Sequence, residues 1–354
     1  MKAIIYTRTG SPEVLELVDR EPGVVGPADV RVRICVSGVN PTDWKSRSGN
    51  GVTRELEHEQ VPNQDGAGVV DAVGSAVTRF SVGDKVWVRD TAYQRATGTA
   101  QQFTVLPEHL VNALPAGVSY DVGASLGIPA LTAHRALTSR ETGPDRLAPG
   151  SLAGIVVLVA GGAGAVGHAA IQLAVWAGAT VITTVSGPAK AELAHAAGAH
   201  HVIDYRSENV VERVAAIAPH GVAIIVEVNP NANLADDVQM ISTGGTIALY
   251  ASGEPDEVLV PVRASMTKNV RYQFVLTYTT SEVEKGNAVR AVGAAAADGA
   301  LEVGAENGLP VIRYPLAETA AAHRAVEDAV VGKVLIDVGS PVTPVAPDSD
   351  EALS

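Results

Sequence analysis

The stretch "VVLVAGGAGAVGHAAIQLA" (residues 156–174) runs from an apolar segment typical of a buried strand, through a cluster of glycines, into an alanine-rich helical pattern. Gly162, Gly164 and Gly167 form a G-x-G-x-x-G motif between the expected strand and the expected helix. In this context the first glycine permits a tight turn, the second lets the backbone approach a pyrophosphate, and the third lets the helix pack on the strand. The free N–H groups of the first helical residues, Ala165 and Val166, then point at the anion. The stretch therefore predicts a dinucleotide site, against the alternative of a glycine-rich turn without a ligand.

Strands and helices alternate on both sides of this turn. The expected strands are 155–160, 180–185, 201–204, 222–226, 246–250 and 272–276, and the expected helices are 165–177, 188–197, 208–217, 232–241 and 281–298. Alternating elements with nearly continuous apolar strands indicate a parallel sheet covered on both faces, the doubly wound α/β class.

The N-terminal part of the chain has a different pattern. Short β-branched runs such as "MKAIIYT" (1–7) and "DVRVRICVSGV" (29–39) are separated by Gly, Pro and Asp turns, which is typical of a compact β unit. The segment 309–340 reads as strand, helix, strand and is expected to return to this unit. We therefore predict a β domain from residues 1–125 and 299–340, a doubly wound domain from 126–298, and a disordered tail over 341–354.

Composition excludes several classes of protein. No apolar run is long enough to cross a membrane, and the first residues lack the features of a secretion signal, so we expect a cytoplasmic protein with no membrane partner. The formal net charge of −13 disfavours nucleic acid as a partner. The single cysteine, Cys35, excludes an internal disulfide and any site built from several cysteines, and we interpret it as a packing residue of a strand.

The residues after the second and third doubly wound strands bear on the choice of nucleotide. An acidic residue about 20 positions after the glycine motif would bind the adenosine ribose and repel a 2′-phosphate. Here Ser186 takes that place, and Lys190 follows it. Tyr205 and Arg206 follow the next strand and would close over the adenine side. These residues favour NADPH over NADH, and the alternative for Lys190 is a solvated helix residue.

The ends of the fourth and fifth strands are further candidate contacts for the cofactor, because doubly wound folds bind ligands at the carboxyl edge of the sheet. Val228 and Asn229 follow the fourth strand, and Tyr250 and Ala251 follow the fifth. We assign no chemistry to them.

Several spaced segments resemble one known family in the same order along the chain. They are "GVNPTDWKSRSG" (38–49), "DGAGVVDAVGSAVTRFSVGDKVW" (65–87), "LGIPALTAHRAL" (126–137), the glycine turn and "GKVLIDV" (332–338). With them the chain resembles the medium-chain dehydrogenase/reductase superfamily and its zinc-independent, zeta-crystallin-like quinone oxidoreductase branch. The resemblance implies a GroES-like β domain, a Rossmann domain, an active site between them, and a homodimer formed through the edge strand at 272–278. The alternative for 272–278 is an internally protected strand of a monomer.

The resemblance also locates the positions where zinc-dependent relatives hold a catalytic metal. These positions fall on Asn40, Gln64 and about Ile128. Two amides and an apolar side chain do not form a useful zinc site, because the ion needs thiolate or imidazole ligands. We therefore predict no metal.

The resemblance implies roles for three residues of the active site. Asn40 would donate its amide to the cofactor or the acceptor, and the alternative is a turn-capping residue before Pro41. Thr132 would contact the nicotinamide carboxamide, or else bond to its own helix backbone. Lys45, which stands beside Trp44 where some relatives have a tyrosine, would stabilise a developing enolate or is a surface charge. Asp43 is expected to fix the loop.

Without a metal, NADPH can deliver hydride to an acceptor that holds negative charge in its own conjugated system. The sequence thus predicts an oxidoreductase acting on a quinone or an electrophilic α,β-unsaturated carbonyl. One alternative is an enoyl-thioester reductase, for which Lys45, Arg47 and Arg54 would supply basic residues at the mouth of a channel. The other is a protein that binds NADPH without turnover.

Overall fold

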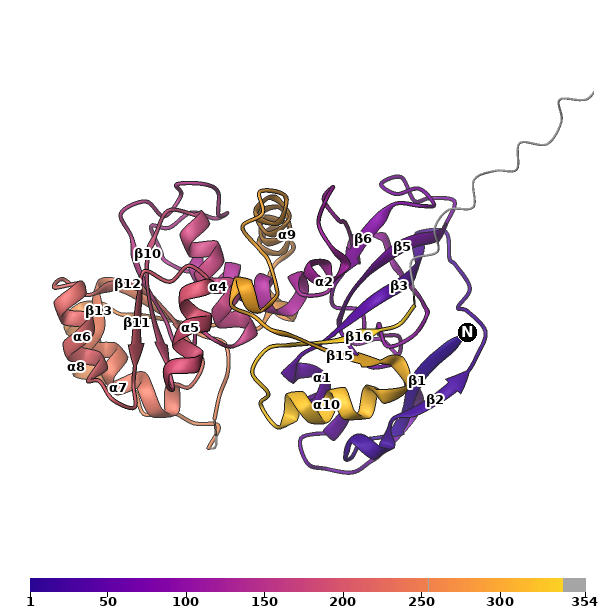
Figure 1. Cartoon of the computed structure of the whole chain (residues 1–354), viewed down its shortest axis with the longest axis horizontal. Helices are drawn as coiled ribbons and strands as arrows, with labels where there is room; N and C mark the ends of the chain where they lie inside the picture. Colours follow the sequence, from indigo (N-terminus) through magenta and orange to yellow (C-terminus); the bar gives the residue numbers. More distant parts are fainter. Residues whose placement is uncertain (254, 340–354) are drawn as a thin grey trace, which may run out of the picture.

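The computed structural model describes residues 1–253 and 255–339. These residues form two lobes, with the middle of the chain in one lobe and both ends of the described chain in the other (Figure 1). The tail predicted over 341–354 lies outside the described residues. The α/β class with a doubly wound domain and a β domain is confirmed.

The first lobe is built on a six-stranded parallel sheet in the order β11-β10-β9-β12-β13-β14. This order places the first strand of the domain next to the fourth, so the two halves of the sheet diverge there and leave a crevice at the carboxyl ends. The strands are β9 (Val156–Val159), β10 (Thr180–Val185), β11 (His201–Asp204), β12 (Val222–Glu227), β13 (Ile241–Leu249) and β14 (Arg271–Phe274).

Helices connect these strands. They are α4 (Ala165–Trp176), α5 (Pro188–Ala196), α6 (Val210–Ile217), α7 (Pro230–Met240), α8 (Val262–Lys268) and α9 (Glu282–Ala297). The helix expected over 232–241 begins at Pro230, since proline fits the first turn where its missing N–H is not needed. Neither α8 nor the first half of β13 is predicted by the sequence pattern.

The second lobe contains a seven-stranded sheet in the order β15-β16-β3-β5-β6-β8 with β7 paired to β3, and a smaller sheet in the order β2-β1-β4. Their strands are β1 (Lys2–Arg8), β2 (Glu16–Asp19), β3 (Asp29–Val39), β4 (Glu55–Gln60), β5 (Asp65–Val73), β6 (Lys85–Val88), β7 (Phe103–Pro107), β8 (Val111–Ala113), β15 (Val311–Pro315) and β16 (Lys333–Asp337). Three helices accompany them: α1 (Pro41–Ser48), α2 (Tyr120–Gly123) and α10 (Thr319–Glu327). The predicted return of the C-terminal segment is confirmed, because β16 pairs antiparallel with β3.

The connection between the lobes is a bent helical segment. It consists of a wide turn over Leu126–Ala130 and α3 (Leu131–Leu137). Gly127 has a non-helical ψ of −108°, and Pro129 has no N–H to donate to the helix ladder. The bend brings this segment against Asp65 of β5, a contact that matters for the site described below.

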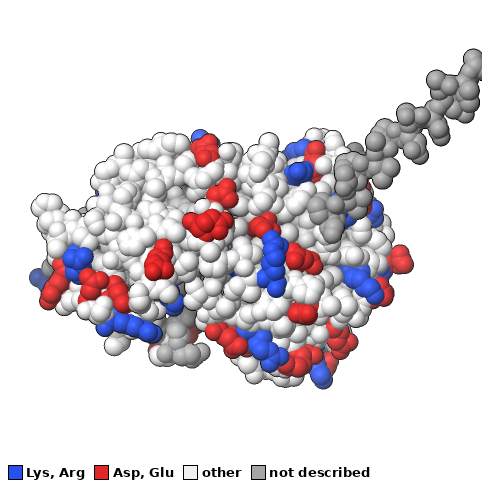
Figure 2. Space-filling view, viewed as in Figure 1, with Lys and Arg blue, Asp and Glu red and all other residues white. Residues whose placement is uncertain are grey.

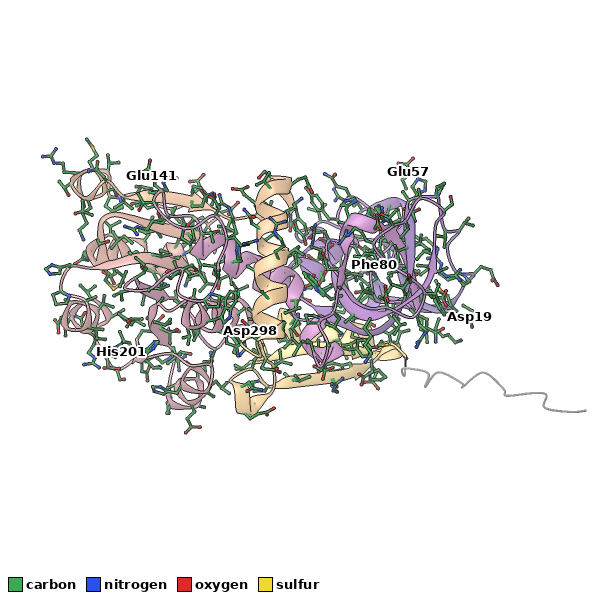
Figure 3. The ribbon with its side chains drawn as sticks, turned by 90° about the horizontal axis from the view of Figure 1, so that it is seen from above. Asp19, Glu57, Phe80, Glu141, His201 and Asp298 are labelled. Atoms are coloured by element: carbon green, nitrogen blue, oxygen red, sulfur yellow. The ribbon has the colours of Figure 1, made fainter. Side chains whose placement is uncertain are left out.

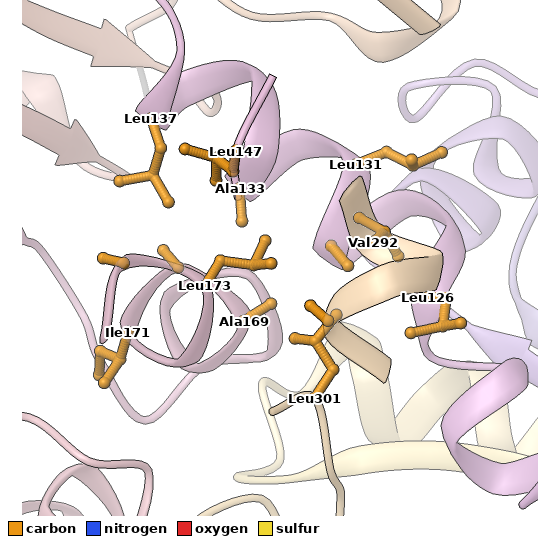
Figure 4. Close-up of a cluster of buried hydrophobic side chains, with 14 of the residues drawn as sticks. Leu126, Leu131, Ala133, Leu137, Leu147, Ala169, Ile171, Leu173, Val292 and Leu301 are labelled. Atoms are coloured by element: carbon orange, nitrogen blue, oxygen red, sulfur yellow. The ribbon is translucent and has the colours of Figure 1, made fainter. Parts of the chain in front are cut away.

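The core between the lobes is made by α3, α4 and α9. Figure 4 shows small and branched side chains from these helices facing one another, among them Ala133, Leu137, Ala169, Leu173 and Val292. The same cluster contains Cys35, so the prediction that this cysteine packs a strand is confirmed. Asp298, which Figure 3 labels, lies just beyond the end of α9. It accepts a 2.9 Å hydrogen bond from Trp176 Nε1 of α4.

The outer surface carries charges of both signs, which are interspersed on the face shown in Figure 2. Within the described residues, no helix is long and apolar enough to span a membrane.

Candidate active site

The glycine turn joins β9 to α4, and its three motif glycines meet different surroundings. A Cβ on Gly162 would lie 2.2 Å from Thr183 Oγ1, and a Cβ on Gly167 would lie 2.4 Å from the carbonyl oxygen of Gly161. These two glycines are therefore required by the packing of the protein itself. A Cβ on Gly164 would meet only the Gly161 carbonyl oxygen at 3.5 Å, which is ordinary contact. Only at Gly164 is the space beside the backbone open to a ligand.

Gly164 is also the N-cap of α4, so the N–H groups of Ala165 and Val166 lie in the first helical turn and lack intrahelical partners. A small cavity of about 150 Å³ adjoins the turn. Its lining includes Gly164, Ser186, Lys190 and Tyr205, as the sequence analysis expects of a site for a phosphorylated adenosine.

Inside this cavity Lys190 Nζ donates a 3.0 Å hydrogen bond to Ser186 Oγ. The ammonium of α5 is thus held at the end of β10 and is not a freely solvated side chain. A hydroxyl and an ammonium side by side supply the donors that a phosphate accepts. Arg206, by contrast, is exposed and does not line this cavity.

The opposite wall of the cavity is formed by Ala329, Val330 and Val331 of the loop between α10 and β16. Sequence reasoning missed these residues because they come from the other lobe, more than a hundred positions away along the chain. All three are apolar and exposed, and such residues give only a weak signal in a sequence.

The other expected cofactor contacts line two larger cavities. Asn229 and Tyr205 line a cavity of about 620 Å³, which shares Gly161 and Tyr205 with the smaller cavity at the glycine turn. Tyr250 and Ala251 line a separate cavity of about 530 Å³ beside β14. The structure therefore joins Asn229 and Tyr205 to the glycine turn, whereas Tyr250 and Ala251 line a different cavity.

A second group of polar residues lies where the two lobes meet, and Asn40 is at its centre. Lys333 Nζ donates to Asn40 Oδ1 at 2.8 Å and to the Val39 carbonyl oxygen at 3.1 Å. Asn40 Nδ2 in turn donates to Asp65 Oδ2 at 2.7 Å. Asn40, Asp65 and Lys333 are all at most 2% exposed. We call these three residues the Asn40–Asp65–Lys333 network.

Burial and charge set the ionisation of this network. Burial lowers the pKa of Lys333 and raises that of Asp65 to about 6, and each charge partly opposes the shift of the other. Asp65 Oδ1 has no hydrogen-bond partner among the described residues, so the carboxylate depends on Lys333, Asn40 and the Ile128 N–H for compensation. Removing the cation would leave a buried charge without an opposite charge.

Asp43 fixes the loop that carries Asn40, as predicted. Its carboxylate accepts hydrogen bonds from the backbone N–H of Asn40 at 2.7 Å and from that of Gln64 at 3.0 Å. Burial, followed by the charge of Asp65, raises the pKa of Asp43 to about 8.

The three positions where the resemblance implies metal ligands in zinc-dependent relatives are brought together, and each is engaged in a hydrogen bond within the protein. Asn40 and the Ile128 N–H both bind Asp65 Oδ2. Gln64 Oε1 accepts a 3.0 Å bond from the Ala92 N–H. Amide groups engaged in this way and an apolar side chain do not fit zinc. Within residues 1–253 and 255–339, no three His, Cys, Asp or Glu side chains are grouped as a metal would need.

Asp65 and Lys333 were missed by the sequence analysis. The available signal was a lysine inside the apolar strand pattern of "GKVLIDV", since a buried lysine requires a partner. Gly127 makes room for the pair, because a Cβ at this position would lie within 1.9 Å of Asp65 Oδ1.

The remaining predicted residues are separate from this network. Thr132 is buried on α3. Lys45 is exposed, with Nζ 5.9 Å from the centre of the Trp44 ring.

The expectation that Arg47 lines the mouth of a channel is wrong. Its guanidinium is fully buried, donates to the Gly10 carbonyl oxygen at 2.6 Å and pairs with Glu327 at 2.8 Å. Arg47 links α1 to α10, because its guanidinium forms an ion pair with Glu327.

An aromatic pair also joins the two lobes near Asn40. The rings of Tyr93, from the loop after β6, and Tyr278, from the turn after β14, are stacked with centroids 4.2 Å apart. The hydroxyl groups of Tyr278 and Thr42 are 3.1 Å apart, and Thr42 lies in the first turn of α1. Burial and the nearby charge of Asp43 raise the pKa of Tyr278, so its hydroxyl keeps its proton.

With this geometry established, the chain can be compared with known proteins. Residues 26–116 match the alcohol dehydrogenase GroES-like domain family, and residues 165–293 match the zinc-binding dehydrogenase family. The quinone oxidoreductase of Lama guanicoe is 30% identical over 341 residues, which cover 95% of this chain and 97% of that protein. The chain therefore belongs to the medium-chain dehydrogenase/reductase superfamily and, within it, to the quinone oxidoreductase branch.

Solved structures agree with this assignment. The Escherichia coli quinone oxidoreductase complexed with NADPH has a TM-score of 0.77 and 25% identity, covering 95% of this chain and all of that one. An NAD-dependent alcohol dehydrogenase has a TM-score of 0.82 and 26% identity, with 96% of this chain covered and 100% of that one. The likeness in fold is thus shared by both kinds of enzyme, and the residues of the site must distinguish them.

Proposed function

We propose that this chain is an NADPH-dependent oxidoreductase that reduces a quinone or an electrophilic α,β-unsaturated carbonyl without a catalytic metal. The observation that carries the proposal is the Asn40–Asp65–Lys333 network. In this network Asn40, one of the positions where the resemblance implies a metal ligand in zinc-dependent relatives, is held between Lys333 and Asp65, so an acceptor must carry its developing negative charge in its own conjugated system. Quinones and enones meet that requirement, whereas simple alcohols and ketones do not.

The nucleotide site fits NADPH. The open side of Gly164 would accept the pyrophosphate, and Ser186 with Lys190 would hold the 2′-phosphate. When bound, NADPH supplies the hydride. The presence of NADPH in the related E. coli quinone oxidoreductase supports this choice.

Asn40 is the group we propose for orienting the acceptor or the cofactor. Its amide nitrogen has two hydrogens, and Asp65 takes one of them. Lys333 on Oδ1 and Asp65 on Nδ2 prevent the amide from turning, so the second hydrogen has a fixed direction. We propose Thr132 for the nicotinamide carboxamide, and we give Lys45 no step because its charge is exposed to solvent.

The structure gives less support to an enoyl-thioester reductase, because Arg47 is unavailable to a phosphorylated carrier. A relative named CurK enoyl reductase is 21% identical and supports the fold alone.

A homodimer through β14 is also part of the proposal. Among the described strands, β14 is the last of its sheet, and Phe274 and Leu276 at its end are 71% and 56% exposed. Leu259, Val260 and Met266 nearby in the sequence are exposed as well. Apolar groups beside an open strand edge favour pairing with a second copy. We retain the cytoplasm as the proposed location and the domain limits 1–125 with 299–340 and 126–298 as the proposed division.

The proposal is tested by an acceptor screen in which NADPH and NADH are oxidised in parallel. Expected substrates are 9,10-phenanthrenequinone and 1,4-benzoquinone with NADPH. Turnover of crotonyl-CoA alone would favour the thioester alternative. Tight NADPH binding without turnover of any acceptor would favour a binding protein.

A further inference from the structure

Two carboxyl side chains are buried together inside the Rossmann domain, beside the turn that carries Asn229. Glu227 is the last residue of β12, and Asp237 lies on α7, and the two are 0% and 1% exposed. Glu227 Oε1 accepts hydrogen bonds from the Asn229 N–H and, at 3.0 Å, from Asn233 Nδ2. No ion pair to either carboxyl group occurs among the described residues. We call them the Glu227–Asp237 pair.

The unsatisfied atoms of this pair identify its protonation state. Among the described residues, Glu227 Oε2 and Asp237 Oδ2 are buried and have no donor. The two carboxyl groups adjoin each other in the lining of one cavity, and a hydrogen bond between two carboxyl groups exists only if one of them carries a proton. Burial and the neighbouring Glu227 raise the pKa of Asp237 to about 9, so Asp237 is the member that holds the proton at neutral pH.

The pair lines the cavity of about 620 Å³ together with Asn229, Asn233 and Gly161. Because Gly161 and Tyr205 line this cavity and also the smaller one with Ser186 and Lys190, the pair adjoins the adenosine side of the proposed nucleotide site. Glu227 holds the turn at Asn229 directly, through the backbone N–H that begins α7.

We propose that the Glu227–Asp237 pair is a positioning pair for the nucleotide, which holds the β12–α7 turn in its binding geometry only while the two carboxyl groups share a proton. This inference rests on the proposed NADPH function. Neither residue is assigned contact with the reacting atoms. Their effect is transmitted through Asn229 and the start of α7.

The surroundings explain why loss of the proton would matter. The titratable groups that face the pair are Asp236 on α7, Tyr250 after β13, Glu208 before α6 and Tyr205 after β11. All of them are acidic or phenolic, and none supplies a positive charge. Two ionised carboxylates in contact would repel each other, and Asp237 would have no donor, so α7 would have to shift away from β12.

The test compares nucleotide affinity across pH in the intact chain and in matched variants. For the wild type, the NADPH dissociation constant should rise at least about tenfold between about pH 7 and about pH 10, because the nucleotide binds the form with the shared proton. NADH should show the same rise, and this separates the pair from any effect at the 2′-phosphate.

Asp237→Asn is the decisive variant. Its amide can donate permanently to Glu227, so its affinity at neutral pH should match the wild type and the alkaline loss should disappear. Glu227→Gln is the second variant with the same expectation, in case the first does not fold. Asp145→Asn removes an exposed carboxylate from the loop before β9 that does not line this cavity, and it should keep the alkaline loss.

A wild type whose affinity is flat to about pH 10, or an Asp237→Asn variant that keeps the alkaline loss, would overturn the inference. The pH dependence of stability, measured on the protein without nucleotide, distinguishes a failure of this inference from a failure of the proposed function. If the pair shares a proton, Asp237→Asn makes the stability less dependent on pH even when no nucleotide binds. If that holds but NADPH does not bind at any pH, the proposed function is wrong.

Discussion

Replacing Lys333 by methionine tests the buried network directly. The substitution keeps most of the apolar stem but removes the ammonium that donates to Asn40 Oδ1 and to the Val39 carbonyl oxygen. Asp65 then remains buried with an unpartnered Oδ1 and no cation. Lys333 reaches Asp65 through Asn40 and not through a direct ion pair, and leaving a buried charge without compensation costs about 3–5 kcal/mol. We therefore expect Lys333→Met to lower the free energy of unfolding by that amount in urea titrations.

Two further variants serve as controls for this measurement. Lys333→Met combined with Asp65→Asn removes both charges and should recover more than half of the loss, since the buried carboxylate is gone. Lys2→Met removes an exposed ion pair with Asp19, where both side chains are at least 50% exposed, and should cost at most about 1 kcal/mol. A loss for Lys333→Met no larger than that for Lys2→Met would refute the account of the network.

Four other predictions follow from the nucleotide site, the aromatic pair and the buried acids. Lys190→Ala should weaken NADPH binding by about 1.5–3 kcal/mol and leave NADH nearly unaffected, and equal losses in titrations with both nucleotides would contradict the assignment of the 2′-phosphate. Gly164→Val should remove binding of either nucleotide at unchanged melting temperature. Gly162→Val should instead lower the melting temperature, because its side chain would meet Thr183 and Ile171. Retained nucleotide affinity in Gly164→Val would contradict the assignment of the space beside Gly164 to the pyrophosphate. Tyr278→Ala removes a stacking contact of about 0.5–1.5 kcal/mol and should lower the free energy of unfolding by at least that much more than Tyr278→Phe, which keeps the ring; equal losses in urea titrations would contradict a stabilising role of the stack. The stability contributed by protonated Asp237 is fully present below its unfolded pKa and is lost as the pH rises toward its folded pKa of about 9. Asp237→Asn should therefore make the free energy of unfolding in urea less dependent on pH across that range. An unchanged dependence on pH would contradict this assignment.

The sequence predicted the fold and the nucleotide crevice because both depend on local patterns. The order of strands and helices follows from hydrophobic periodicity, and Gly162, Gly164 and Gly167 occupy a motif whose demands are set by neighbouring backbone. The structure adds the distinction that two of these glycines serve packing and one faces open space.

The network at Asn40 could not be predicted in the same way. Lys333 and Asn40 are 293 positions apart, and they meet only because β16 returns to pair with β3. For the same reason Arg47 was misjudged as a surface charge, since its partner Glu327 lies 280 positions away. Tyr93 and Tyr278 come from separate lobes and carry no motif. Residues that pair over such long sequence separations appear in the sequence only as isolated charged or aromatic residues, and the sequence does not indicate their partners.

The most direct test of the central claim is the rate of NADPH oxidation with 9,10-phenanthrenequinone after the purified protein has been dialysed against a strong zinc chelator. The account predicts turnover that is unchanged by the chelator and not increased by added zinc, together with slower turnover when NADH replaces NADPH. Activity that disappears with the chelator and returns with one equivalent of zinc would contradict it.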